Sequence, residues 1–393
     1  MKRYKYIGLL LLAGLAAACQ KETVAPAGAG YSTEAILFTT PYTVSKSAAM
    51  RDGDFIEGDK VGVLGYSKVT YTANGVEVDA STSLWDAKKE WAKPEVFYNQ
   101  ELTYKGNGVL SYNYSGDNAV GTLRGWYNEP DYTYAFFAYY PYVNVNSYYN
   151  PGTITAEDGR TSMGTIRLSD EDDTGDPTFT YTMPHEGGDT DVSLDLDVVP
   201  DVMLAYTVNH RHSDGAVSLN FRHMLCAFEF EVNNYNTYPV TINSLQFSGE
   251  DFYKSFTITG QEQDYTPNDG ERYSGYFNLL PNGAITCEAA DTDENGVVIA
   301  PSNTKITVSR DSEDPVDLLF IPDADGKITE RECTVTVETS KGDVRQQNIK
   351  EGMSFEPGTR SIFSINIIGN NFVIQVRTLD NWSDGGDSNI YFD

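Results

Sequence analysis

Residues 132–142 read YTYAFFAYYPY, an aromatic stretch that ends just beyond a proline. In an extended strand Tyr134 and Phe136 fall on one side, whereas Phe137 and Tyr139 fall on the other. Large side chains on both sides are typical of a strand that is covered on both faces. The other interpretation is that these flat rings stack on sugar faces at a surface.

The rest of the chain repeats this β pattern. Short β-branched and aromatic stretches alternate with Gly, Asn, Asp and Pro, and no segment sustains a 3.6-residue apolar period over three turns. Asn-Gly pairs at residues 74–75, 282–283 and 295–296 suit tight hairpins. We therefore predict an all-β chain of antiparallel β-sandwiches. Strands are expected at residues 35–39, 60–66, 132–139, 203–208, 227–232, 241–247, 255–259, 305–309, 317–321, 334–339, 361–368 and 372–378.

The length, composition and net charge of the chain exclude some classes of protein. The chain has 393 residues, enough for two globular domains, and 12% of them are aromatic, which excludes a disordered tail protein. Its 57 acidic side chains outnumber 28 basic ones, giving a net charge of −29. Because such a field repels phosphate backbones, the chain is not expected to bind nucleic acid.

The N-terminal residues predict export. Basic side chains precede an apolar run at residues 7–18 that is too short to span a membrane but suits a secretory signal. The following Cys19 comes directly after small residues, which resembles a bacterial lipobox. Residues 1–18 are then a lipoprotein signal peptide, and the lipidated Cys19 anchors the protein in the outer membrane. The alternative is an ordinary signal peptidase site with an incidental cysteine.

Composition along the chain indicates the domain limits. Residues 19–30 hold few large side chains and read as a flexible tether. Residues 170–201 contain eleven acidic and no basic side chains, so we expect this stretch to be largely solvated. A polar connection follows, and we place the boundary near residue 209. The predicted domains are residues 31–208 and residues 209–393, the second with a C-terminal strand or donor extension.

Several motifs occur in an order that resembles the fimbrillin family, the pilin-like lipoproteins of Bacteroidetes. The resemblance implies two tandem transthyretin-like β-sandwich domains and a structural subunit or tip adhesin of a cell-surface pilus, or fimbria. It also implies partners: other pilin subunits and a host or bacterial surface ligand. The motifs are FIEGDKVGV (55–63), FFAYYPY (136–142), DVMLA (201–205), LNFRHMLCA (219–227), PVDLLFIP (315–322), FEPG (355–358) and LDNWSDGG (379–386).

The family's assembly mechanism implies two functional features near the N-terminus. A trypsin-like maturation protease cuts after an arginine, and the released first strand is replaced by an extension of the next subunit. Arg51 is the first arginine after the signal and is the candidate cleavage site. The alternative is an ordinary solvated loop arginine. The removable first strand would be Ala35, Ile36, Leu37, Phe38 and Thr39.

The C-terminal segment is the candidate donor or closing strand. Phe372, Ile374 and Val376 alternate on one side, and Trp382 follows. The alternative is that residues 372–378 form the domain's own last strand, which leaves only the remainder from Asn381 free to extend.

Three other constellations are not expected to bind metal. Residues 291–296 open like a calcium loop, but the twelfth position is Ser302 instead of a bidentate Glu, so we predict a polar hairpin. The histidines lie in a polar connection or at a change of strand parity, where backbone bonding is expected. The cysteines suit neither a disulfide framework nor a zinc cage and are predicted to be core or strand residues. These residues are His210, His212, His223, Cys226, Cys287 and Cys333.

No enzyme or cofactor is predicted. The chain lacks a Gly-x-Ser-x-Gly elbow, a His-Glu-x-x-His motif and a phosphate-binding Gly-x-x-x-x-Gly-Lys loop. The alternative to a pilus subunit is a glycan-binding outer-membrane surface lipoprotein. Exposure of the aromatic rings of residues 126–142 would favour that alternative, and their burial would disfavour it.

Overall fold

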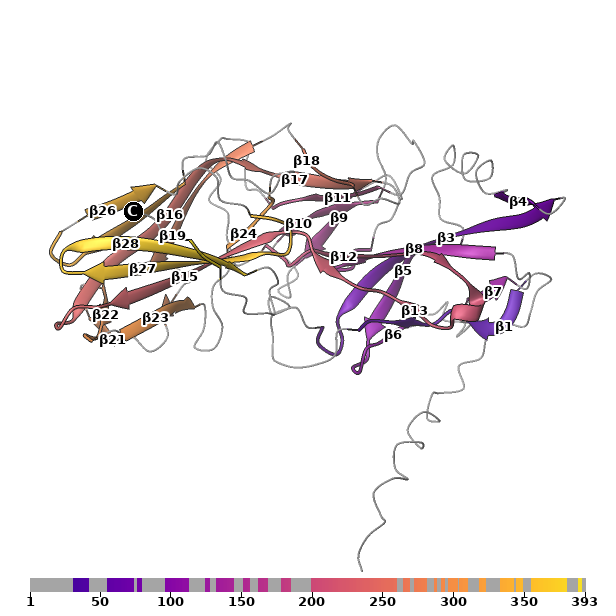
Figure 1. Cartoon of the computed structure of the whole chain (residues 1–393), viewed down its shortest axis with the longest axis horizontal. Helices are drawn as coiled ribbons and strands as arrows, with labels where there is room; N and C mark the ends of the chain where they lie inside the picture. The colour runs from indigo at the N-terminus through magenta and orange to yellow at the C-terminus, as the bar shows by residue number, and fades with distance from the viewer. Residues whose placement is uncertain are drawn as a thin grey trace, which may run out of the picture.

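The protein is all-β, as a computed structural model shows (Figure 1). The described strands are accompanied by one short 3-10 helix, η3 (His212–Asp214). No described helix is long and apolar enough to cross a membrane. The structure describes residues 31–41, 55–73, 76–79, 96–112, 124–127, 132–144, 151–155, 162–168, 178–184, 199–259, 264–268, 272–280, 286–287, 291–293, 296–302, 304–309, 318–322, 333–342, 344–348, 355–379 and 388–390.

A nine-stranded sheet forms the N-terminal part of the molecule. Its long central strands pair antiparallel, whereas the two-residue strands β2 and β13 pair parallel near one edge. The strand order is β13 (Val217–Ser218), β2 (Phe38–Thr39), β6 (Val109–Tyr112), β5 (Phe97–Tyr104), β3 (Lys60–Ala73), β8 (Tyr132–Tyr140), β12 (Met203–His210) and β14 (Arg222–His223), with β4 (Val76–Asp79) on β3.

Two smaller sheets flank it. β1 (Tyr31–Ala35) pairs with β7 (Gly125–Tyr127). The predicted single strand at residues 35–39 is therefore divided between β1 and β2, which belong to different sheets. A five-stranded sheet has the order β18 (Asp264–Pro267), β17 (Ser255–Thr259), β11 (Thr178–Thr182), β10 (Ser162–Arg167) and β9 (Gly152–Thr155).

Two sheets form the C-terminal part, which lies at the opposite end of the molecule from β1 (Figure 1). The first has the order β20 (Thr286–Cys287), β23 (Thr304–Ser309), β15 (Cys226–Asn234), β27 (Arg360–Ile368), β28 (Asn371–Leu379) and β29 (Ser388–Ile390), with β24 (Leu318–Phe320) on β15. The second has the order β21 (Asp291–Asp293), β22 (Gly296–Ile299), β16 (Val240–Tyr253), β25 (Thr334–Thr339) and β26 (Val344–Asn348), with β19 (Arg272–Leu280) on β16.

Aromatic side chains join the two C-terminal sheets. Phe228 and Phe230 of β15 contact Phe247 of β16, with ring centroids 5.6 and 5.7 Å apart. The prediction of purely antiparallel sandwiches was wrong in one respect here, because β15 and β27 pair parallel over eight positions. Parallel neighbours need a long connection, which strand patterns alone do not specify.

The strand β8 is covered on both faces, as its aromatic residues predict. Phe136 belongs to a core cluster on one face of the nine-stranded sheet. Phe137 belongs to a second cluster on the other face, where it contacts Phe179 of β11 at 6.0 Å. That second cluster continues through Phe256 of β17 to Phe228 in the C-terminal part. One continuous core therefore joins this face of the nine-stranded sheet to the C-terminal sheets.

The middle of the chain is less solvated than its acidic residues predict. Residues 170–201 are not uniformly solvated, since β11 lies within them and buries Phe179 and Tyr181 completely. The acidic residues on either side made this short alternation of Thr with aromatic residues hard to recognise in the sequence. Strand pairing also crosses residue 209, because β13 and β14 join the nine-stranded sheet and β17 joins β11. The domain limits and the tandem transthyretin-like arrangement stay predictions.

The predicted hairpin and core cysteines are confirmed where the structure describes them. β21 and β22 form an antiparallel hairpin, and Gly296 has a φ of +141° that a side chain would strain. Cys226 and Cys333 are buried, and Cys287 lies in β20. Among the described residues no group of three or more His, Cys, Asp or Glu could hold a metal ion.

The turn that leads into β3 is closed by Asp59. Its carboxylate accepts a hydrogen bond from the Ile56 backbone N–H at 2.8 Å, and Gly58 has a φ of +107°. The Gly58 N–H donates to the Tyr104 carbonyl at 3.0 Å, and the Tyr104 N–H donates to the Asp59 carbonyl at 2.8 Å. Burial raises the pKa of Asp59 to about 6, against the opposing effect of the Ile56 hydrogen bond.

We expect Asp59→Asn to remove a pH-dependent loss of stability. A carboxyl group with a raised folded pKa resists ionisation in the folded state, so its penalty appears as the pH rises from its ordinary pKa of 3.8 to about 6 and is constant above that. The wild type should lose free energy of unfolding relative to the variant across this window. Urea unfolding of both proteins from about pH 3 to about pH 8 measures the difference. Parallel pH curves would contradict it.

Candidate functional site around the N-terminal strands

The strand β2 is held inside the nine-stranded sheet by neighbours on both sides. Phe38 and Thr39 pair parallel with β13 and antiparallel with β6. Two further bonds come from β13 and the residue after it: the Val217 N–H donates to the Leu37 carbonyl, and the Leu219 N–H donates to the Thr39 carbonyl, each at 2.8 Å. Withdrawal of this strand would therefore leave unpaired backbone groups along both β6 and β13.

The side chains of this segment alternate between core and surface. Ile36 and Phe38 are buried, at 0% and 1% exposure, whereas Leu37 between them is 52% exposed. The Phe38 ring meets Phe97 and Phe136 edge-on, with centroids 5.5 and 5.4 Å apart. Burial of one phenylalanine contributes about 1.5–3 kcal/mol. The predicted first strand thus completes a hydrophobic core.

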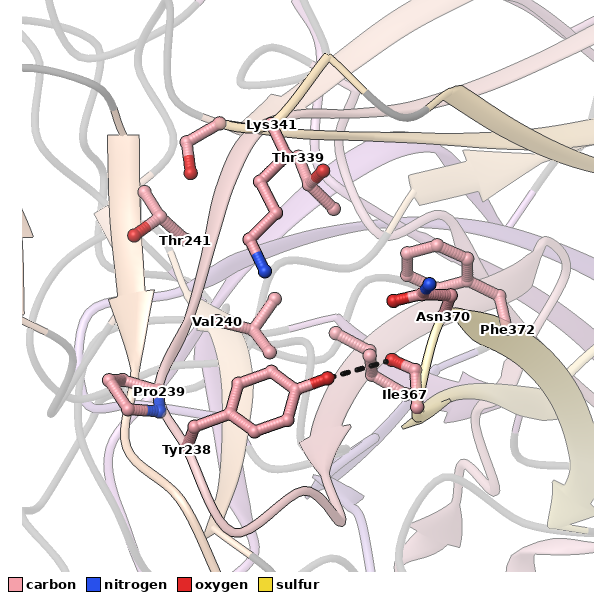
Figure 2. A pocket seen from close by; sticks show the side chains of 11 residues that line it. Tyr238, Pro239, Val240, Thr241, Thr339, Lys341, Ile367, Asn370 and Phe372 are labelled. Atoms are coloured by element: carbon pink, nitrogen blue, oxygen red, sulfur yellow. Dashed lines mark hydrogen bonds between the residues drawn. The ribbon is translucent and has the colours of Figure 1, made fainter.

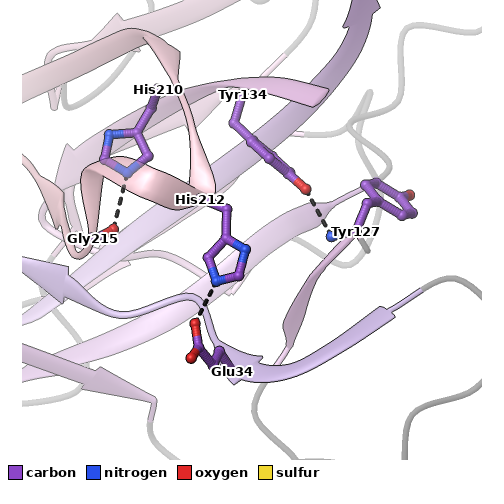
Figure 3. Close-up of polar contacts among 6 residues, drawn as sticks. All are labelled: Glu34, Tyr127, Tyr134, His210, His212 and Gly215. Atoms are coloured by element: carbon purple, nitrogen blue, oxygen red, sulfur yellow. Dashed lines mark hydrogen bonds and ion pairs between the residues drawn. The ribbon is translucent and has the colours of Figure 1, made fainter. Parts of the chain in front are cut away.

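A histidine contact ties β1 to the segment after β12. Figure 3 shows the His212 ring directed at Glu34, with Nε2 2.5 Å from Oε2. The neighbouring His210 places Nε2 3.1 Å from the Gly215 carbonyl oxygen. Both imidazoles stack on Trp126, with ring centroids 5.5 and 5.4 Å away. These interactions hold β1 and η3 around one indole ring.

The third histidine, His223, was predicted to bond backbone, and the structure shows that its ring also contacts a carboxylate. His223 Nδ1 lies 2.9 Å from Asp201 Oδ1, with both side chains largely buried. The contact accompanies the pairing of β14 with β12, in which Met203 lies opposite His223. The pair therefore fastens the edge of the nine-stranded sheet.

The residues that would be lipidated and cleaved lie outside the described part of the chain. This applies to Cys19 and Arg51, so both stay predictions. The described chain stops at Pro41 and resumes at Phe55. The buried Phe55 ring contacts Phe221 at 4.9 Å, next to the segment that pairs with β2.

The C-terminal candidate strand is an integral part of its own sheet. β28 pairs with β27 along its whole length, from Asn371 to Leu379. Ile374 and Val376 are buried and Phe372 is partly buried. This arrangement favours the alternative that β28 is the domain's own last strand. Its other edge is partly covered by β29, and Trp382 between them lies outside the described residues.

The aromatic stretch does not form a solvent-facing row. Trp126, Tyr134, Phe136, Phe137 and Tyr139 are all buried. The Tyr134 hydroxyl accepts a hydrogen bond from the Tyr127 backbone N–H at 2.8 Å, as Figure 3 shows. Burial of these rings disfavours the glycan-binding alternative at this place.

Sequence reasoning missed two features of the site. The parallel partner of β2 comes from residues 217–218, about 180 positions along the chain, and its two residues carry no strand signal of their own. The Glu34 contact with His212 is equally remote. The alternation of Val217, Leu219 and Phe221 is the one signal that could have placed this segment in a sheet.

Comparisons with known proteins agree with the fold. A comparison with curated proteins gave no significant match. Among solved structures, a fimbrial protein from Bacteroides vulgatus is 16% identical, covers 88% of this chain and 99% of its own, and superposes with a TM-score of 0.53, which shows a shared fold. A candidate cell adhesion protein from Bacteroides ovatus is 13% identical over 88% of this chain and 95% of its own, with a TM-score of 0.46.

The family comparison covers most of the sequence. A model described as Fimbrillin-like matches residues 47–382, a range that includes every motif on which the resemblance was based except the last four residues of LDNWSDGG. The resemblance is therefore confirmed. Because the match spans more than four fifths of its length, this chain belongs to the fimbrillin-like family.

Proposed function

We propose that the protein is a structural subunit or tip adhesin of a cell-surface fimbria. Its membership of the fimbrillin-like family supports this role. Other pilin subunits are its expected partners, and a host or bacterial surface is the expected target of adhesion. The role is structural and adhesive and involves no catalysis or cofactor.

The proposed assembly is strand exchange. The precursor is exported as a lipoprotein, anchored in the outer membrane through Cys19, and cut after Arg51 by a trypsin-like protease. The observation that carries this proposal is the position of residues 36–39, which are bonded on both sides and buried through Ile36 and Phe38. A groove vacated by such a segment offers an apolar slot and two rows of backbone partners to a strand from the next subunit.

The short length of β2 suits its replacement by a strand from another subunit. β2 itself has two residues, and each backbone hydrogen bond contributes only about 0.5–1.5 kcal/mol net. A strand this short is stably held while covalently attached, but it can be replaced once the chain is cut. A longer incoming strand could form more backbone bonds and so drive the exchange.

We expect limited trypsin digestion of the folded precursor to cut first after Arg51. The product should then oligomerise slowly, as followed by mass spectrometry and light scattering after size exclusion. Arg51→Gln should remove both the first cut and the oligomers. Lys46→Gln, a matched change in the same segment, should leave both unchanged. A first cut elsewhere, or a cut product that stays monomeric, would argue against the stalk-subunit role.

Truncation of Phe38 and of its neighbour Leu37 should change the free energy of unfolding by different amounts. Phe38→Ala deletes a fully buried ring and should lower the free energy of unfolding by about 3–5 kcal/mol. Leu37→Ala, on the exposed side of the same segment, should change it by less than about 0.5 kcal/mol. After cleavage the Phe38 variant should also oligomerise faster than the Leu37 variant. Equal losses of free energy of unfolding from the two substitutions would contradict the burial of Phe38 and the exposure of Leu37.

A further inference from the structure

Two hairpin turns and a connection between the two C-terminal sheets meet at the end of the molecule farthest from β1 and enclose a pocket. They are the connection between β15 and β16, the turn between β25 and β26, and the turn between β27 and β28, the last of which lies at the left end of the view in Figure 1. The pocket is a small open hollow of about 40 Å³. This is room for about three water molecules or for one small group such as a carboxylate, so the rest of a bound ligand would lie outside it.

Buried asparagines fix the shape of this pocket. The Asn234 side chain donates to the Tyr238, Ile299 and Ala300 carbonyls at 2.9 to 3.1 Å. The Asn236 side chain accepts the Gly369 N–H at 2.6 Å and donates to the Gly369 carbonyl at 3.3 Å. The β15–β16 connection and the β27–β28 turn are thus bonded to each other, which pre-organises the pocket they form.

One cation lies in the pocket without a carboxylate. Figure 2 shows the Lys341 ammonium directed toward the Tyr238 ring, whose centroid is 5.4 Å away. Within the described part of the chain Lys341 forms no ion pair, although acidic side chains outnumber basic ones 57 to 28. The lining residues include no Asp or Glu. The pocket is therefore positive on an acidic protein.

The remaining lining resembles a sugar site. The Tyr238 ring is 41% exposed and is held by a bond from its hydroxyl to the Gly369 carbonyl at 3.5 Å. Val240 and Phe372 add an apolar surface beside it. Thr339 contributes a buried hydroxyl that has no hydrogen-bond partner among the described residues. An aromatic face with hydroxyl and amide groups suits a sugar ring, and an unpaired ammonium suits a carboxylate.

We propose that this pocket binds a carboxylate-bearing monosaccharide at the end of a glycan. The carboxylate pairs with Lys341, and the apolar face of the sugar packs on Tyr238. The proposal deepens the adhesive role proposed above and rests on it for its biological setting. The pocket does not involve β1 or β2, so binding by the uncut monomer and assembly of the cut protein are separate measurements.

The test is a ligand-observed NMR titration of the uncut full-length protein with glucuronate, glucose and acetate. Glucose matches glucuronate except for the carboxylate, and acetate supplies a carboxylate without the ring. We expect saturable binding of glucuronate and at least about tenfold weaker binding of the other two. Equal binding of glucose would overturn the role of the ammonium, and equal binding of acetate would overturn the sugar assignment. Absence of glucuronate binding would overturn the site.

Matched variants locate the binding. Lys341→Met should weaken glucuronate binding about tenfold or more, because a charge-assisted bond is lost, and should leave glucose binding unchanged. Tyr238→Ala should weaken both sugars. Lys105→Met, an exposed lysine in the turn between β5 and β6, serves as the control and should have no effect. Unfolding midpoints equal to that of the wild type verify that each variant is folded. Unchanged glucuronate binding by Lys341→Met would contradict the proposal.

Discussion

The insertion of β2 between β6 and β13 is the contact on which the N-terminal sheet depends. Phe38 fills the aromatic core of that sheet, and the backbone on either side is bonded to segments about 70 and 180 residues away in the chain. The backbone pairing of this strand is therefore short, whereas its Phe38 side chain is fully buried. The proposed assembly depends on this combination.

A shared hydrophobic core joins the N-terminal and C-terminal sheets of the described structure. β8 has a core on each face, and the second of these cores runs through β11 and β17 into the C-terminal sheets. Strands from both predicted domains share the five-stranded sheet.

Much of the fold follows from local sequence patterns, and the exceptions have a physical cause. Alternating aromatic and β-branched residues correctly predicted strands such as β8, β16 and β27, and the burial of Ile36 and Phe38 agrees with the predicted first strand. The two-residue strand β13 and the parallel pairing of β15 with β27 could not be predicted, because such pairing is decided by distant segments. The distal pocket escaped prediction for the same reason, since it is assembled from three separate connections between strands.

The most direct test of the account is hydrogen exchange at the backbone groups that β2 covers. In the uncut precursor the amides of Val217 and Leu219 should be protected, because they donate to Leu37 and Thr39. After cleavage at Arg51, and before oligomers form, these amides should lose their protection while those of β27 and β28 keep theirs. Protection that is the same before and after the cut would contradict the claim that this strand can be withdrawn.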